Sequence, residues 1–181
     1  MVASLKNATQ YTSEQFVESC GAILFDLTAS QNKKVCLVHY HAKDEWLLAK
    51  GRRNCGESRH EAALREVFEE TGYKAHLHPV TMRTRAPPID EQEHMPDEPR
   101  SYENLTEPFM VTMRQLSDEG GNDVKIIWWY IAVLDKDFLP SGGGEEQFAP
   151  AFFPLQHALE KLSFPNDRIV LQRAIDIVEA Q

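Results

Sequence analysis

The sequence lacks several features, and each absence excludes a class of protein. No stretch of its 181 residues reaches the roughly 18 consecutive apolar residues of a membrane-spanning helix. The first twenty residues also lack the hydrophobic segment of a secretory leader. Cysteine occurs three times, at Cys20, Cys36 and Cys55, and no pair has the spacing of a zinc site. An odd count indicates reduced thiols. We therefore expect a cytoplasmic protein, with a nuclear location open as well, and secretion open if a leader preceded this sequence.

Positive charge is also scarce. The chain has 19 Lys and Arg residues against 28 Asp and Glu residues, a net charge of −9 and a pI of about 5.2. This balance argues against broad binding to a nucleic-acid backbone or to an anionic membrane. We expect a small molecule as the partner, with no stable nucleic-acid partner and no membrane. The oligomeric state stays open.

The length and composition predict one domain over residues 1–181. A hydrophobic content of 42% with 9% aromatic residues is enough for a core, and there is no internal repeat. Residues 1–16 are polar and predict a flexible arm. The residue patterns predict both strands and helices. The strands expected are 19–27, 35–41, 46–48, 74–80, 109–113 and 125–134, with a short one at 152–153; the helices are 58–71, 155–162 and 166–180.

The helix that follows the glycine loop at Gly51 carries the most informative pattern. Ser58 and Glu61 have the spacing of a capping box, and Gly72 suits a left-handed turn that ends the helix. At 100° per residue, an apolar stripe is expected on one side and three carboxylates on the other. The stripe contains Ala63, Leu64, Val67, Phe68 and Thr71, and the carboxylates are Glu66, Glu69 and Glu70.

Three glutamates within one and a half turns repel one another, and the repulsion grows when they are desolvated. A hard divalent cation would turn that repulsion into binding, because Mg²⁺ and Mn²⁺ prefer oxygen ligands. The alternative is an ordinary solvated helix face, since glutamate is a good helix former and is rarely buried.

The stretch GRRNCGESRHEAALREVFEETGY, from Gly51 to Tyr73, resembles the signature of the Nudix hydrolases. In that signature a glycine and a glutamate are followed at fixed spacing by Arg-Glu, an aliphatic residue, Glu-Glu and a glycine. The positions that match are Gly51, Glu57, Arg65, Glu66, Val67, Glu69, Glu70 and Gly72, with Tyr73 at the final apolar position.

The resemblance implies an α/β/α sandwich with a mixed sheet and a catalytic loop-helix-loop. It also implies metal binding by Glu69, Glu70 and the carbonyl oxygen of Gly51. Glu66 would orient or deprotonate the attacking water, or share the metal. Arg65 would hold these carboxylates by ion pairing. The expected catalytic residues are Arg65, Glu66, Glu69 and Glu70, and the expected metal ligands are Gly51, Glu66, Glu69 and Glu70, around Mg²⁺ or Mn²⁺.

Basic residues surround the loop glycine. Lys50, Arg52 and Arg53 could hold the phosphates of a substrate, because guanidinium groups grip several phosphate oxygens. A solvated basic turn is the alternative interpretation.

Residues outside the signature add candidates. Residues 83–108 form a proline-rich acidic stretch, interpreted as a long loop that could act as a lid, with Arg83, Arg85 and Arg100 as phosphate contacts. Glu145 or Glu146 could supply one more carboxylate. The remaining candidates are His39 and His41 on one strand face, Trp128 or Trp129 stacked on a base, and Asn166 as a helix cap.

These features together predict a metal-dependent pyrophosphohydrolase that cleaves a phosphoanhydride bond in a polyphosphorylated small molecule. The chain is similar to Nudix enzymes that act on diphosphoinositol polyphosphates or diadenosine polyphosphates, although Ala49 stands where those enzymes often have proline. A nucleotide-sugar or coenzyme pyrophosphatase and a messenger-RNA decapping enzyme are less favoured alternatives. A catalytically silent phosphate-binding module and a structural protein with solvated glutamates also stay open.

Overall fold

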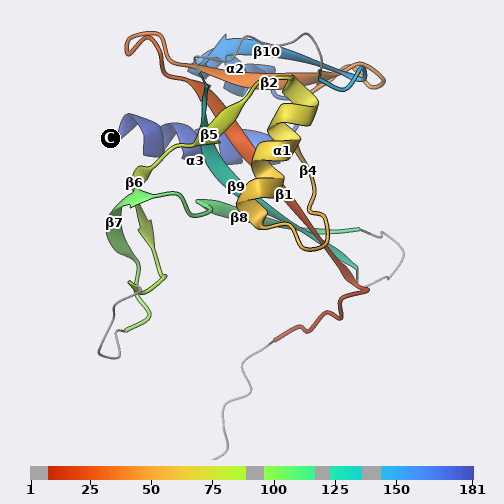
Figure 1. Cartoon of the computed structure of the whole chain (residues 1–181), viewed down its shortest axis with the longest axis vertical. Helices are drawn as coiled ribbons and strands as arrows, with labels where there is room; N and C mark the ends of the chain where they lie inside the picture. The colour runs from red at the N-terminus through yellow and green to blue at the C-terminus, as the bar shows by residue number, and fades with distance from the viewer. Residues whose placement is uncertain (1–7, 89–95, 117–122, 136–143) are drawn as a thin grey trace, which may run out of the picture.

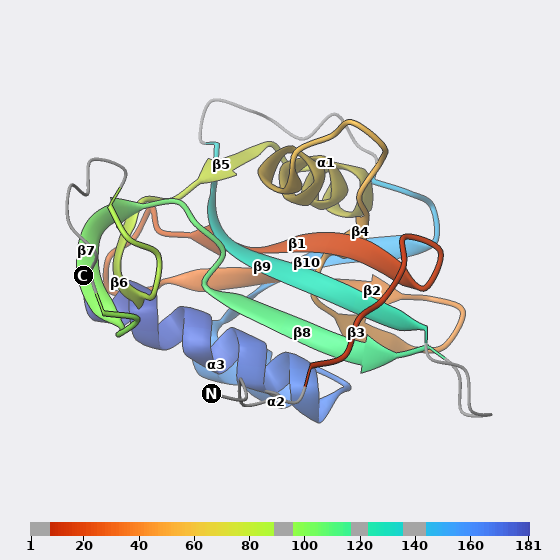
Figure 2. The same cartoon turned by 90° about the horizontal axis from the view of Figure 1, so that it is seen from below.

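Three layers make up the domain in a computed structural model that describes residues 8–88, 96–116, 123–135 and 144–181. Helix α1 (Arg59–Thr71) covers one face of a central sheet, and α2 (Leu155–Lys161) and α3 (Pro165–Glu179) cover the other face, as Figures 1 and 2 show. The expected α/β/α sandwich is confirmed. None of the helices in the described ranges is long and apolar enough to cross a membrane.

The central sheet is mixed, as expected. Its order is β10-β2-β1-β9-β5, with β3 attached to β2, β4 to β1 and β8 to β9. Strands β1 and β9 run parallel over ten paired residues, whereas the other pairs are antiparallel. The bounds are β1 Phe16–Asp26, β2 Lys34–Tyr40, β3 Glu45–Leu47, β4 Lys50–Arg52, β5 Ala75–Leu77, β8 Met110–Gln115, β9 Val124–Leu134 and β10 Phe148–Pro154.

Each face of the sheet has its own apolar core. On the side of α1, Cys20, Ala22 and Leu24 of β1 pack with Ala63 and Val67 of the helix. On the side of α2 and α3, alternate residues of the same strands pack with the helices, among them Ile23, Phe25, Trp129, Leu171 and Ile175. Because side chains alternate along a strand, the apolar residues of β1 and β9 point to both faces of the sheet and supply both cores.

Close contact between β1 and β4 fixes the start of the signature. Gly21 pairs with Lys50, and Cys20 pairs with Gly51. A methyl group on Gly21 would lie 2.5 Å from the Ala49 carbonyl oxygen and 2.7 Å from the Trp129 ring. Only glycine leaves room there for the backbone of β4. The sheet therefore holds Gly51 before the loop begins.

Helix α1 begins and ends as the sequence predicts, but its faces differ from the prediction. Ser58 and Glu61 form the capping box, and Gly72 adopts a left-handed conformation with φ of 71°. Phe68, expected in the docking stripe, is 39% exposed, whereas Glu66 and Glu70 are only 9% and 8% exposed. The two glutamates lie towards β4 and β10, since they pack against the strand that carries Gly51 and the segment before β10.

Four other predictions about elements are wrong. The strand expected over 74–80 is two strands, since β5 ends at Leu77 and β6 (Val80–Thr84) belongs to a separate two-stranded sheet with β7 (Arg100–Leu105). The interpretation of 83–108 as one loop is therefore too broad, and β10 is longer than the expected strand at 152–153. Asn166 does not cap α3, because that helix begins at Pro165 and Phe164 holds the cap position without a side-chain hydrogen bond.

Candidate active site

The site lies where α1 passes over Gly51 at the edge of β4. A methyl group on Gly51 would overlap the carboxylate of Glu66. The absence of a side chain at position 51 thus lets the Glu66 carboxylate reach the backbone of the signature loop. The Lys50 amide donates a hydrogen bond of 3.0 Å to Oε2 of Glu70. Backbone and carboxylates therefore meet at this point.

Arg65 connects three carboxylates of the signature. Its Nε donates to Oε1 of Glu57 at 2.7 Å, and its Nη1 donates to Glu66 at 2.8 Å and to Glu69 at 2.7 Å. Its Nη2 donates to the carbonyl oxygen of Arg52 at 2.9 Å. These hydrogen bonds, those to Glu57 first, raise the pKa of Arg65 above its ordinary value, so the guanidinium stays charged. The Arg65 guanidinium therefore holds the loop and two acidic residues of the helix together.

Glu70 is the least solvated acid of the site. Burial raises the pKa of its carboxyl to about 8, although the charge and the amide of Lys50 oppose the rise. Burial also raises the pKa of Glu66, again against the hydrogen bond and charge of Arg65. The charge of Glu66 adds to the raised pKa of Glu70, and the charge of Glu69 adds to that of Glu66, because like charges repel in a poorly solvated place.

Glu145 comes to the same site from the segment before β10. Its amide donates a 2.8 Å hydrogen bond to the carbonyl oxygen of Glu69. Its charge contributes to the raised pKa values of Glu66 and Glu70. A methyl group on Gly144 would lie 2.8 Å from the carbonyl oxygen of Glu70, so this segment packs closely on the end of α1. Both expected acids are exposed, but Glu145 adjoins the cluster through its main-chain hydrogen bond to Glu69.

The donor set suits a hard divalent cation, because it consists of carboxylates and the backbone around Gly51. Among the described residues, no three His, Cys, Asp or Glu side chains already lie at metal-binding spacing. Arg65 now bonds Glu66 and Glu69. A cation would therefore have to replace part of that network, and the buried charge of Glu70 favours such an exchange. The metal-binding roles of Gly51, Glu66, Glu69 and Glu70 stay predictions.

The three basic residues beside Gly51 have different surroundings. Arg52 is exposed. Arg53 forms hydrogen bonds within the protein. Its Nε donates to Oε2 of Glu18 at 2.9 Å, and its Nη1 donates to the carbonyl oxygen of Glu57 at 2.9 Å. Lys50 lines a pocket on the opposite face of the sheet from α1. Substrate binding by all three residues stays a prediction, and the contacts of Arg53 favour a structural part for it.

The pocket beside Lys50 was not predicted from the sequence, because its residues come from five separate segments. It has a volume of about 440 Å³. Trp129 is buried in its floor, and Nε1 of the indole donates to Thr112 at 3.0 Å. Burial raises the pKa of Asp167 at its wall, against the charges of Lys50 and Arg114. The lining is Lys43, Glu45, Leu47, Lys50, Thr112, Arg114, Ile127, Trp129, Phe164, Asn166 and Asp167.

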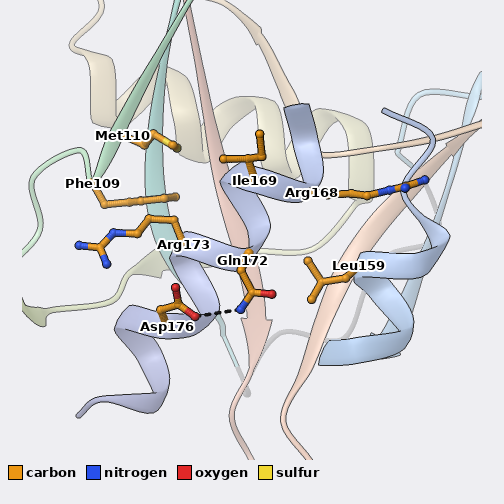
Figure 3. Close-up of a pocket in the computed structure, with 8 residues that line it drawn as sticks. All are labelled: Phe109, Met110, Leu159, Arg168, Ile169, Gln172, Arg173 and Asp176. Atoms are coloured by element: carbon orange, nitrogen blue, oxygen red, sulfur yellow. Dashed lines mark hydrogen bonds between the residues drawn. The ribbon is translucent and has the colours of Figure 1, made fainter. Parts of the chain in front are cut away.

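A second hollow on the same side of the sheet is a groove of about 620 Å³ between α2, α3 and the start of β8. Figure 3 shows its side chains, with a hydrogen bond of 2.8 Å from Gln172 to Asp176. Phe109, Met110 and Ile169 give it an apolar lining. No residue of the signature lines this groove, so we do not assign the chemistry to it.

Other expected residues lie outside the carboxylate cluster. Arg83 donates to the carbonyl oxygen of Pro99 at 3.0 Å, and Arg85 pairs with Asp97 at 3.0 Å. These contacts join residues at the end of β6 to residues just before β7. The role of residues 83–108 as a lid, with Arg100 as a phosphate contact, stays a prediction. His39 pairs with Asp44 at 2.7 Å and lies against the edge of the His41 ring, which places both histidines together.

Comparison with known proteins adds the family. The NUDIX domain model matches residues 20–174. The 8-oxo-(d)GTP phosphatase of Mycolicibacterium smegmatis is 25% identical over 180 residues, which is 94% of this chain and 45% of that protein. A Bacillus subtilis relative is 34% identical over 71 residues, covering 39% of this chain and 48% of its own length. The chain spans about half the length of the curated relatives it matches.

Solved structures resemble the chain at low identity. A binary complex of the C. elegans Ap4A hydrolase has a TM-score of 0.56 and 14% identity, and covers 91% of this chain and 99% of that one. The NUDIX domain of Shewanella oneidensis NrtR, solved with ADP ribose, has a TM-score of 0.56 and 17% identity, and covers 92% of both chains. These matches support the same fold.

The buried charge of Glu70 gives a pH-dependent stability. Its pKa rises from 4.5 to about 8 on folding, so the folded state holds the proton more tightly and stability is lost as the pH rises through that range. The variant Glu70→Gln keeps an oxygen for the Lys50 amide but no charge. We expect the free energy of unfolding of Glu70→Gln to increase relative to that of the wild type as the pH rises from 5 to 9. Urea unfolding in the presence of a metal chelator measures this difference.

The control for this comparison is Glu160→Gln, which removes an exposed carboxylate from α2. Its difference from the wild type is measured over the same pH range. A Glu70→Gln difference that changes with pH no more than the Glu160→Gln difference would contradict the assignment of a desolvated carboxylate.

Proposed function

Because the chain belongs to the NUDIX domain family, we propose that it hydrolyses a phosphoanhydride bond in a polyphosphorylated small molecule. The observation that carries this proposal is that Glu66 and Glu70 of α1 meet the backbone of β4 at Lys50 and Gly51. Arg65 bonds Glu69 beside Glu66, and Glu145 adjoins the same end of α1. Solvated glutamates on a structural protein would not need to be buried, whereas Glu66 and Glu70 are buried. A desolvated acidic cluster is typical of a site that takes a cation.

The residues present suit each need of the reaction. A water oxygen must attack one phosphorus, its proton must leave, and the bond from that phosphorus to the bridging oxygen must break. A Mg²⁺ or Mn²⁺ ion held by Glu69, Glu70 and the Gly51 carbonyl would supply positive charge to the phosphate oxygens. Glu66 is the proposed acceptor of the water proton, because burial raises the pKa of its carboxyl. Arg65 fixes the orientation of Glu66 through a 2.8 Å hydrogen bond.

The pocket beside Lys50 supports a nucleoside polyphosphate over a diphosphoinositol polyphosphate. Its floor contains Trp129 and Ile127, and its wall combines Phe164 with the half-buried acid Asp167. An aromatic wall and a polar acid suit a planar base with hydrogen-bond donors, whereas an inositol ring surrounded by phosphates would require cations on every side. Lys50 and Arg114 at the same pocket would face the phosphates.

The comparisons support the same preference, since one relative is named an 8-oxo-(d)GTP phosphatase and one structural neighbour an Ap4A hydrolase. Nucleoside triphosphates and diadenosine polyphosphates are therefore the proposed substrate class. The diphosphoinositol polyphosphates stay the second candidate, because Arg52 is exposed beside the carboxylates and could contact further phosphates.

Turnover tests the reaction. A panel of diadenosine polyphosphates, nucleoside triphosphates, diphosphoinositol polyphosphates and nucleotide sugars is incubated with Mg²⁺ or Mn²⁺, and phosphate and nucleotide products are measured. We expect turnover of the first two classes, with a loss of at least about a hundredfold in kcat for Glu70→Gln, because a ligand charge is removed.

The exposed Glu160→Gln variant is the matched control and should keep the wild-type rate. Equal rates for Glu70→Gln and wild type would refute the assignment of the carboxylate cluster. Saturable nucleotide binding without turnover of any class would instead favour a catalytically silent module.

The base pocket gives a separate prediction. Asp167→Asn replaces an acid at the pocket wall by an amide and so changes the hydrogen bonds that the wall can offer a base. Because Asp167 lies outside the carboxylate cluster, we expect KM for a nucleoside polyphosphate to rise about tenfold while kcat stays unchanged. The control is Asp176→Asn on the same helix, which lines the other groove (Figure 3). Steady-state kinetics of both variants measure the difference. An equal KM in the two variants would show that the pocket does not hold the base.

A further inference from the structure

Glu18 of β1 bonds both ends of the signature loop, although it lies more than thirty positions before that loop in the sequence. Its side chain is 11% exposed. Oε2 accepts a 2.9 Å hydrogen bond from Nε of Arg53, near the start of the loop. Oε1 accepts a 2.8 Å hydrogen bond from Nε of Arg59, the first residue of α1. One carboxylate therefore holds the beginning and the end of residues 53–59.

A third contact ties this carboxylate to the sheet. Nε1 of Trp128 on β9 donates to Oε1 of Glu18 at 2.9 Å. The guanidinium of Arg59 lies over the Trp128 ring, 4.2 Å from the ring centre. Burial raises the pKa of Glu18, but hydrogen bonds from Arg59, Trp128 and Arg53 outweigh it and the net pKa is lowered. Glu18 therefore stays charged among its partners.

The contacts of Glu18 continue to the carboxylate cluster. Arg53, held by Glu18, donates from Nη1 to the carbonyl oxygens of Asn54 at 3.1 Å and Glu57 at 2.9 Å. The carboxylate of Glu57 in turn accepts from Nε of Arg65 at 2.7 Å. Arg65 bonds Glu66 and Glu69 directly. An unbroken chain of hydrogen bonds thus runs from Glu18 to the acids of α1.

We propose that Glu18 is a positioning residue, which sets the shape of the signature loop and through Glu57 the place of Arg65. Its part in turnover rests on the proposed hydrolase function. The main chain already joins Glu18 to the loop, since the Arg53 amide donates to the Glu18 carbonyl oxygen at 3.0 Å. Replacing the side chain therefore leaves the strand pairing in place and tests the carboxylate alone.

The first experiment does not depend on turnover. Glu18→Gln keeps the size of the side chain and removes its charge, and amide hydrogen exchange is compared with that of the wild type. We expect faster exchange at Asn54 and Glu57, whose amides bond within the loop, and unchanged exchange in the middle of α1. Exposed Glu14→Gln, just before β1, is the matched control and should leave both regions unchanged. Unchanged exchange in the loop of Glu18→Gln would overturn the proposal.

The second experiment is a double-mutant cycle on kcat and KM at saturating Mg²⁺. We expect Glu18→Gln and Arg53→Ala each to lower kcat on the order of tenfold with little change in KM, and the double variant to lose no more than either one. Additive losses, or a loss confined to KM, would overturn a shared positioning role. Absence of wild-type turnover would refute the hydrolase function, while the exchange result would still decide whether Glu18 shapes the loop.

Discussion

Repulsion among poorly solvated carboxylates is the constraint on which this structure depends. Glu57, Glu66 and Glu69 lie close together with the guanidinium of Arg65 bonded to all three. Glu70 receives only partial compensation from Lys50, and its pKa is raised to about 8. The fold thus brings acidic side chains together at a place where Glu66 and Glu70 are poorly solvated. In a family of hydrolases, a divalent cation would stabilise such a cluster of acids.

The rest of the domain holds this charge in place. The parallel pair of β1 and β9 contributes to both cores, so the strand that carries Gly21 and Glu18 is packed on both faces of the sheet. Gly21 lets β4 approach β1, and Gly51 lets the Glu66 carboxylate approach β4. Neither glycine has a side chain, and the space at each is occupied by another group: the Ala49 carbonyl oxygen and Lys50 at Gly21, and the Glu66 carboxylate at Gly51. The sheet and the carboxylate site are therefore in direct contact.

Much of this could be predicted from the sequence, because local signals suffice for local features. The capping box of α1, the glycine that ends it and the strands close to β1 and β2 follow from neighbouring residues. The burial of Glu66 and Glu70 was missed because an amphipathic pattern treats all glutamates as solvated, whereas here a glycine and a main-chain amide accommodate them. The Lys50 pocket and Glu18 were missed for another reason. Their residues meet only through tertiary contacts, which no spacing along the chain reveals.

We propose that the carboxylates around Gly51 exchange part of the Arg65 network for a divalent cation. Titration with Mn²⁺ tests this most directly in the wild type and in Glu70→Gln, with bound ion measured by the loss of the electron paramagnetic resonance signal of free Mn²⁺. We expect saturable binding by the wild type and loss of this binding in the variant. Absence of saturable binding by the wild type, or unchanged binding by Glu70→Gln, would contradict it.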